Sequence, residues 1–203
     1  MEIGSYLHQL GQVIERLDQH IIERVVAELY RGFLEERMVF LIGNGGSAAN
    51  ASHFAQDLAK GVLKDVKDRR LRALSLTDNT AYISAVANDD GYEHVFERQL
   101  HTFGNHGDIL IAISGSGNSA NIIRAVEYAQ TESMTVIAFT GYDGGQLRRL
   151  ANIAVHIPVM EMCTVESIHS VLFHLIVNLL RQKITGYSVD VSCFAAFNAS
   201  AAR

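Results

Sequence analysis

Two pairs of polar side chains in this sequence have types and spacings that suit acid–base or metal chemistry. His53 and Asp57 are four residues apart, so on a helix they share one face, about 40° apart. Glu166 and His174 are eight residues apart, or about 80° around a helix axis, whereas His169 lies about 140° from His174 and should face other neighbours. If the two helices pack together, both pairs could converge, and a set of imidazoles and carboxylates suits Zn²⁺.

The same residues also have a plainer interpretation. His53 and Asp57 could form an ordinary ion pair on a solvated helix face, and His174 could be a core histidine. Spacing alone favours this interpretation, because no signature of the His-Glu-x-x-His kind accompanies the residues. Other charged residues fit turns, caps or wet helix faces, namely Asp89, Asp90, Asp143, Lys60 and Lys64.

Two glycine–serine turns suggest a binding site for a phosphate group. Residues 43–47 and 114–119 each follow an apolar run and precede a helical pattern. Glycines let backbone amides approach an anion, and a helix N-terminus adds unpaired N–H groups and a positive dipole end. Serine hydroxyls add further donors. Each turn alone could simply be a tight connection with helix caps, but the pair predicts a phosphate held from two sides.

A dinucleotide site is a further alternative. Gly43-x-Gly45-x-x-Ala48 matches the dinucleotide fingerprint, and so does the second turn from Gly115 to Ala120. The first acidic candidate after the next strand is Asp78, about 30 residues past Ala48, where the fingerprint expects about 20. Neither turn ends in Gly-Lys-Ser or Gly-Lys-Thr, as the phosphate loop of a nucleoside triphosphatase does. The serines of the two turns therefore favour a binding site for a monophosphate.

Strand and helix patterns alternate along the chain, which predicts an α/β fold of three layers around a parallel sheet. We expect one domain over residues 1–203, with an N-terminal helix over 1–36, an α/β core over 37–186 and a tail over 187–203. The carboxyl ends of the strands should gather the turns at one edge of the sheet. The expected strands are 38–42, 71–76, 109–113, 135–140 and 153–157, and the expected helices are 47–60, 80–87, 92–103, 119–131, 145–150 and 164–182.

Composition narrows the class of protein. The 203 residues are 48% hydrophobic and 19% charged, which predicts a packed core. A net charge of −5 argues against nucleic acid as a partner. No apolar run approaches about 20 residues, so no membrane span is expected. Cys163 and Cys193 form no disulfide framework, and the start of the chain lacks a signal-peptide pattern, so we expect a cytoplasmic protein.

These motifs resemble the sugar isomerase (SIS) domain family, and within it the phosphoheptose isomerases. The resemblance covers nearly the whole chain. It depends on residues 43–49, 52–55, 87–89, 113–119 and 140–145, and on the helix with Glu166, His169 and His174.

The resemblance implies a flavodoxin-like sheet, a homotetramer with active sites between subunits, and an aldose–ketose isomerase. The implied reaction converts sedoheptulose 7-phosphate to D-glycero-manno-heptose 7-phosphate through an enediol. Asp57 would move the proton between carbons and His174 would serve the oxygen. Zinc would be held by His53, Asp57, Glu166 and His174. Substrate would be bound by Asn44, Gly45, Ser47, Asn88, Asp89, Ser114, Gly115, Ser116, Ser119 and Glu166.

The chain departs from the family pattern at four positions. Asp57 stands where the family has glutamate, Glu166 where it has glutamine, Gly115 where threonine is usual, and Gly61 where arginine is often found. The alternative within the family is a non-catalytic SIS protein that binds a phosphosugar or a protein partner, like the one that associates with the replication initiator DnaA. Such proteins lack the catalytic carboxylate and the final histidine, which this chain keeps at Asp57 and His174.

Overall fold

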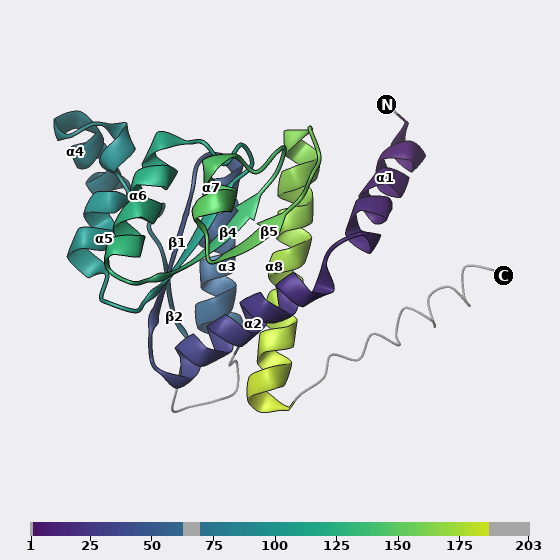
Figure 1. Cartoon of the computed structure of the whole chain (residues 1–203), viewed down its shortest axis with the longest axis horizontal. Helices are drawn as coiled ribbons and strands as arrows, with labels where there is room; N and C mark the ends of the chain where they lie inside the picture. The colour runs from purple at the N-terminus through teal and green to yellow at the C-terminus, as the bar shows by residue number, and fades with distance from the viewer. Residues whose placement is uncertain (1, 63–69, 187–203) are drawn as a thin grey trace.

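A five-stranded parallel sheet lies at the centre of the structure, a computed structural model that describes residues 2–62 and 70–186 (Figure 1). The strand order is β2-β1-β3-β4-β5, which is the flavodoxin-like order. The predicted fold class is therefore confirmed. The strands are β1 (Met38–Gly43), β2 (Arg72–Ser75), β3 (Ile109–Ser114), β4 (Thr135–Thr140) and β5 (Ile153–His156).

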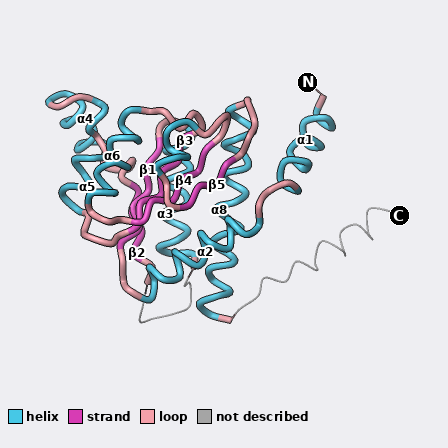
Figure 2. Tube along the Cα trace, viewed as in Figure 1, coloured by secondary structure: helices cyan, strands magenta, loops and turns pink. Residues whose placement is uncertain are grey.

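Helices cover both faces of the sheet, as Figure 2 shows. One face carries α2 (Gln19–Leu34), α3 (Gly46–Gln56) and α8 (Met162–Thr185), and the other carries α4 (Thr80–Asp89), α5 (Glu97–Phe103), α6 (Ala120–Thr131) and α7 (Gly145–Leu150), with a short helix η2 (Tyr92–His94) between α4 and α5. Successive strand residues point to opposite faces, so Leu41 lies in the first core and Phe40 in the second. This alternation gives the three predicted layers.

The prediction of one continuous N-terminal helix is wrong. The segment forms α1 (Ile3–Glu15) and α2, separated at residues 16–18. The Asp18 carboxylate accepts a hydrogen bond from the His20 N–H and caps α2, so a new helix begins there. No residue of α1 is buried, and the helix stands away from the sheet in Figure 1. Its apolar side chains Ile3 and Leu7 are exposed.

Helix α3 ends in a wider turn that carries a predicted site residue. The helix expected over residues 47–60 is α-helical to Gln56 and continues as one π-helical turn, η1 (Asp57–Gly61). The Val62 N–H donates to the Asp57 carbonyl oxygen at 3.1 Å, five residues back. Turns of this kind are frequent at functional sites. Asp57 therefore stands at a change of helical winding.

Helix α8 has the length and hydropathy of a membrane-spanning helix, but it is a core helix of this fold. Its residues Ile168, Leu172 and Ile176 are buried in the same core cluster as α2 and α3. The core helix of a soluble protein has this same composition.

Some of the predictions lie outside the described residues, namely those for the tail over 187–203, for Lys64 and for Cys193.

His169 is the histidine that enters the core. Its side chain is fully buried, with ring contacts to Phe139 and Phe173, and neither ring nitrogen has a hydrogen-bond partner among the described residues. Burial disfavours the charged imidazolium and lowers the pKa of His169 from 6.5 to about 4. The polar backbone of Thr140 favours the protonated form and raises the pKa, whereas repulsion by the charge of His156 lowers it. His169 is therefore neutral in the folded protein at neutral pH.

This burial predicts a loss of stability in mild acid. The unfolded chain takes up a proton at His169 near pH 6.5 and the folded chain only near pH 4, so this contribution to the free energy of unfolding is intact above pH 6.5 and falls as the pH drops toward 4. The full loss is about 3 kcal/mol. Urea unfolding at pH 7 and pH 4.5 measures most of this loss, and a His169→Leu variant should show a smaller difference between the two pH values.

The exposed His20 provides the matched control, since a His20→Leu variant should keep the wild-type difference. An equal pH dependence in the wild type and the His169→Leu variant would contradict the assignment.

Candidate functional site

The sheet places the two glycine–serine turns side by side. Strands β1 and β3 pair with Gly43 opposite Ile113, so both turns leave the same edge of the sheet, next to the N-termini of α3 and α6. Between them lies a cavity of about 110 Å³. It is lined by Asn44, Ser47, Ile113, Ser114, Gly115, Ser116, Ser119, Met162 and Glu166. We call this the cradle. Gly45 is not among its lining residues and is the N-cap residue of α3.

A third turn, over residues 141–145 between β4 and α7, packs against the second glycine–serine turn through backbone contacts. Gly117 has a φ of 66°, and a Cβ there would overlap the carbonyl oxygen of Gly144. The Leu147 N–H donates to the Gly117 carbonyl at 2.9 Å. Asp143 accepts from the Gly145 N–H within the third turn, which agrees with its interpretation as a turn residue. The shape of the cradle is therefore fixed by packed backbone.

Two side chains of α8 close the cradle. A Cβ on Gly115 would overlap the Met162 sulfur, so the methionine fills the space that a side chain at position 115 would need. A Cβ on Gly46 would overlap the Glu166 carboxylate in the same way. Gly115 stands where threonine is usual in the family that the chain resembles, and the Met162 thioether occupies the space that a threonine side chain would need.

A second cluster lies further along α3 and α8. Asp57 Oδ2 is 3.4 Å from His53 Nε2 and 3.7 Å from His174 Nε2, and the two imidazole rings meet edge to face at 5.0 Å. Both imidazoles are about half exposed, so His174 is not the core histidine of the plainer interpretation. One ligand atom from each residue lies within 4.8 Å of the others, which fits the two-histidine, one-carboxylate donor set that Zn²⁺ accepts.

The packing of α3 against α8 brings this cluster together. Phe54 stacks on Phe173 with ring centroids 4.4 Å apart, and the Asn50 side chain donates to the Glu166 carbonyl at 3.2 Å. Because residues early in α3 contact residues early in α8, and later residues contact later ones, the two helices run in the same direction.

The structure does not bring every predicted residue to one place. Among the described residues, Glu166 is not part of the metal-type cluster, and its carboxylate lies in the cradle. Asn88 and Asp89 are exposed at the end of α4 and do not line the cradle. The Asn88 side-chain amide donates a hydrogen bond to the Asp89 carboxylate. Asp78, the acid considered for a dinucleotide, accepts hydrogen bonds from Ser52 and Thr77.

Two partners of Asn44 were not predicted from the sequence. Asn121 of α6 exchanges two hydrogen bonds with the Asn44 side chain, and the Tyr92 hydroxyl donates a third. Asn121 lies two residues after Ser119, inside the first turn of α6, and that position was the available signal.

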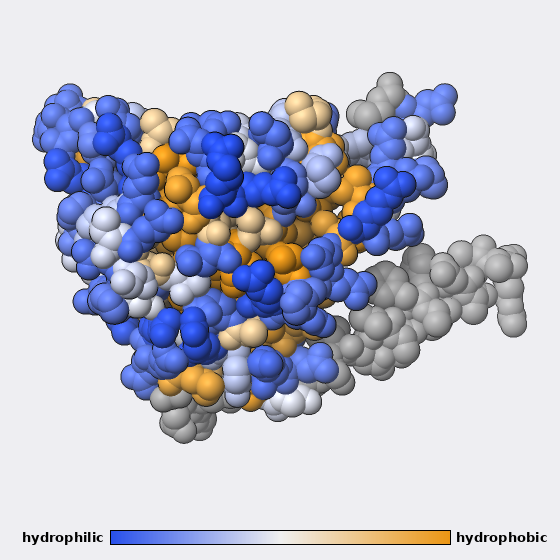
Figure 3. All heavy atoms as spheres, viewed as in Figure 1, coloured by the Kyte–Doolittle hydropathy of each residue, from blue (hydrophilic) through white to orange (hydrophobic). Residues whose placement is uncertain are grey.

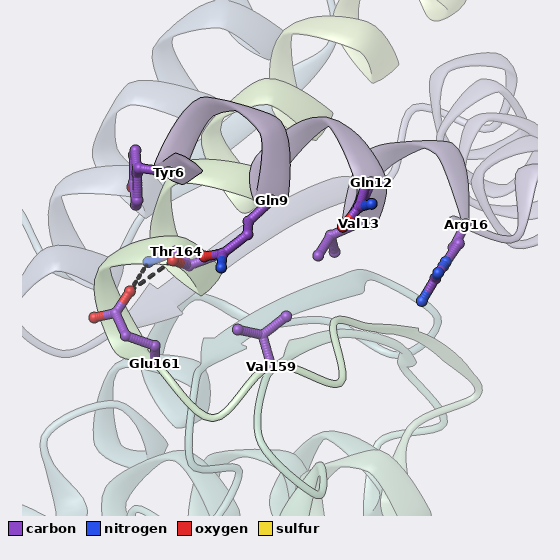
Figure 4. Close-up of a pocket in the computed structure, with 8 residues that line it drawn as sticks. All are labelled: Tyr6, Gln9, Gln12, Val13, Arg16, Val159, Glu161 and Thr164. Atoms are coloured by element: carbon purple, nitrogen blue, oxygen red, sulfur yellow. Dashed lines mark hydrogen bonds between the residues drawn. The ribbon is translucent and has the colours of Figure 1, made fainter. Parts of the chain in front are cut away.

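A larger groove of about 440 Å³ lies between α1 and the start of α8 (Figure 4). Glu161 lines it and caps α8, accepting hydrogen bonds from Thr164 and from the Cys163 N–H. These bonds, with the Thr164 side chain as the largest cause, lower the pKa of Glu161 to about 2. None of the predicted site residues lines this groove.

Comparisons with known proteins show which family the chain resembles. The model of the SIS domain matches residues 5–141. The chain is 34% identical over 189 residues to the phosphoheptose isomerase of Sulfurimonas denitrificans, covering 93% of each chain, and 38% identical over 181 residues to that of Clostridium acetobutylicum, covering 89% and 88%. The solved structure of phosphoheptose isomerase GmhA from Neisseria gonorrhoeae superposes with a TM-score of 0.80 at 29% identity, over 88% of this chain and 96% of that one.

The cluster geometry predicts a divalent-metal site that needs both histidines. Calorimetric titration of chelator-treated protein with Zn²⁺ should show one high-affinity site per chain, and a His53→Ala variant should bind at least about tenfold more weakly because it loses one ligand. A His20→Ala variant, which removes an exposed histidine from a similar His–carboxylate pair, should bind as the wild type does. Equal affinity in the His53→Ala variant would rule out the site.

The position of Glu166 predicts a different result for a Glu166→Gln variant. Its carboxylate lies against Gly46 in the cradle, so we expect the Zn²⁺ affinity to change by less than about threefold. A loss as large as that of the His53→Ala variant would instead make Glu166 a ligand.

Proposed function

Since the chain belongs to the SIS domain family and is an isomerase of the phosphoheptose isomerase group, we propose that it interconverts sedoheptulose 7-phosphate and D-glycero-manno-heptose 7-phosphate. The phosphate binds in the cradle. The carbonyl end of the sugar lies at Asp57, His53 and His174.

One observation carries this proposal, which is that the cradle and the cluster lie at two levels of the same helix pair. Ser47 and Asp57 are ten residues apart, and a helix rises about 1.5 Å per residue, so their backbones are about 15 Å apart. Side chains from both levels shorten the gap. Such a separation suits a sugar whose phosphate is at the far end of the carbon chain from its carbonyl group.

The two sets of residues have complementary tasks. Hydroxyls of Ser47, Ser114 and Ser119 and the helix N-termini of α3 and α6 hold the phosphate by hydrogen bonds and dipoles. Asp57, with a side chain only 20% exposed, takes a proton from carbon 1 of the ketose and returns one to carbon 2 of the enediol. His174 moves the proton between the two oxygens. Proton number is conserved, and no external oxidant or reductant is needed.

A metal would be held by His53, Asp57 and His174. When bound, Zn²⁺ supplies Lewis-acid polarisation of a sugar oxygen. The residues themselves orient the reacting carbons, because the His53 and His174 rings both lie against Oδ2 of Asp57, in edge-to-face contact with each other, and restrict the directions from which substrate can approach that oxygen.

Replacement of the base tests the proposal. The purified protein should convert sedoheptulose 7-phosphate to the aldose, as measured by NMR of the sugar. An Asp57→Asn variant should lose turnover by about 10²- to 10⁴-fold, because it cannot accept the proton, while binding sedoheptulose 7-phosphate within a few-fold of the wild type. A Glu23→Gln variant, which neutralises an exposed carboxylate paired with His20, should turn over normally.

Two outcomes would overturn the assignment. Wild-type protein that binds the sugar phosphate without converting it would favour the non-catalytic alternative. Full turnover by the Asp57→Asn variant would remove Asp57 as the base.

We also propose that the protein is a cytoplasmic homotetramer in which neighbouring subunits complete the sites. Exposed apolar residues of α1 and α8, such as Leu7, Val171 and Leu175, support a subunit interface, and Figure 3 shows apolar surface beside α1. Asn88 and Asp89 would then serve a neighbouring subunit's site. Light scattering should give four times the chain mass of 22.4 kDa, and a monomer would contradict this arrangement.

A further inference from the structure

We propose that Asn121 and Tyr92 are positioning residues that join the two phosphate turns into one cradle and fix Asn44 as a hydrogen-bond donor to the phosphate. This inference rests on the proposed function, because it assumes that the cradle binds the phosphate of the substrate.

The first observation is a reciprocal amide pair between the turns. The Asn44 Nδ2 donates to the Asn121 Oδ1 at 2.9 Å, and the Asn121 Nδ2 donates to the Asn44 Oδ1 at 2.9 Å. Asn44 belongs to the turn after β1, and Asn121 to the first turn of α6, directly after the second glycine–serine turn. Asn121 is only 3% exposed. The two hydrogen bonds are therefore largely shielded from water and directly connect the two halves of the cradle.

The second observation is the hydroxyl of Tyr92. It comes from the short helix η2, on the opposite side of the sheet from α3, and donates to the Asn44 Oδ1 at 3.0 Å. Gly91 before it has a φ of 106°, a conformation that a side chain would strain, so the approach of this segment depends on the glycine. Tyr92 itself is 55% exposed and is therefore open to substitution without loss of core packing.

Together these bonds determine what Asn44 offers to a ligand. A carboxamide oxygen has two acceptor positions and the nitrogen has two donor hydrogens. The Asn44 oxygen already accepts from Asn121 and Tyr92, and the nitrogen donates once to Asn121. Among the described residues, one N–H of Asn44 remains without a partner. Asn44 lines the cradle, so this side chain offers the cavity a donor and not an acceptor.

The charge of the cradle makes this orientation important. Glu166 lines the same cavity, and a carboxylate offers only acceptors. No lysine or arginine of the described part of the chain lines it. Phosphate binding there depends on correctly aimed neutral donors, and an Asn44 turned with its oxygen toward the phosphate would add repulsion. Asn121 and Tyr92 prevent that turn.

Binding of inorganic phosphate, together with steady-state kinetics on sedoheptulose 7-phosphate, tests the inference. An Asn121→Ala variant should bind inorganic phosphate about tenfold more weakly and raise KM by a similar factor, because the donor is no longer held in place. Its kcat should stay within about threefold of the wild type, because Asp57 and His174 are unaffected. A Tyr92→Phe variant, which removes only the hydroxyl, should weaken phosphate binding about threefold or more.

Gln99 provides the control for a merely structural effect. It is a carboxamide only 1% exposed that donates to the carbonyl oxygens of Leu76 and Val95, and it does not line the cradle. A Gln99→Leu variant should lower the melting temperature as the Asn121→Ala variant does, but keep the wild-type affinity for inorganic phosphate and the wild-type KM.

The outcomes separate this inference from the proposed function. Wild-type phosphate affinity in the Asn121→Ala variant overturns the positioning role. If that variant does not fold, the exposed Tyr92→Phe variant decides, and unchanged affinity there overturns the role equally. If the wild type binds phosphate but does not isomerise the sugar, the function fails while the phosphate titrations still decide the positioning role. If the wild type binds no phosphate, both fail.

Discussion

The site depends on the hydrogen-bonded pairing of β1 with β3. These strands are far apart in the sequence, but they are neighbours in the sheet, with the chain turning in opposite directions on either side of them. In such sheets ligands bind where the strand order reverses, because the connections diverge there and leave an opening. The two glycine–serine turns fill both sides of that opening. The placement of α3 and α6, and through α3 the contact with α8, follows from the same pairing.

The electrostatics of the cradle follow from backbone more than from charged side chains. Two helix N-termini and several hydroxyl groups face the cavity, while Glu166 is the one ionisable lining residue in the part of the chain that the structure describes. Dipoles and neutral donors bind an anion more weakly than a cluster of arginines does. Weaker binding allows the product to dissociate more readily. The carboxylate beside them suits hydroxyl groups of a sugar, which can donate to it.

Periodicity and turn chemistry predicted the sheet and most helices, since apolar strand runs and glycine turns are local signals. The break between α1 and α2 was missed because the Asp18 cap competes with an apolar repeat that continues across it. The convergence of His53, Asp57 and His174 needed the packing of α3 on α8, which spacing alone does not contain. The distance between Glu166 and that cluster, and the pairing of Asn121 with Asn44, also result from tertiary contacts. Residue types predicted the chemistry, and the packing of α3 on α8 determined which of these groups lie close together.

The contact between Gly117 and Gly144 has one more consequence. Because backbone packs directly on backbone at the second turn, the loop has few alternative conformations to lose when an anion arrives. Binding to a preorganised loop costs little ordering entropy. Capture of the ligand is then governed by encounter and desolvation, with little contribution from loop rearrangement.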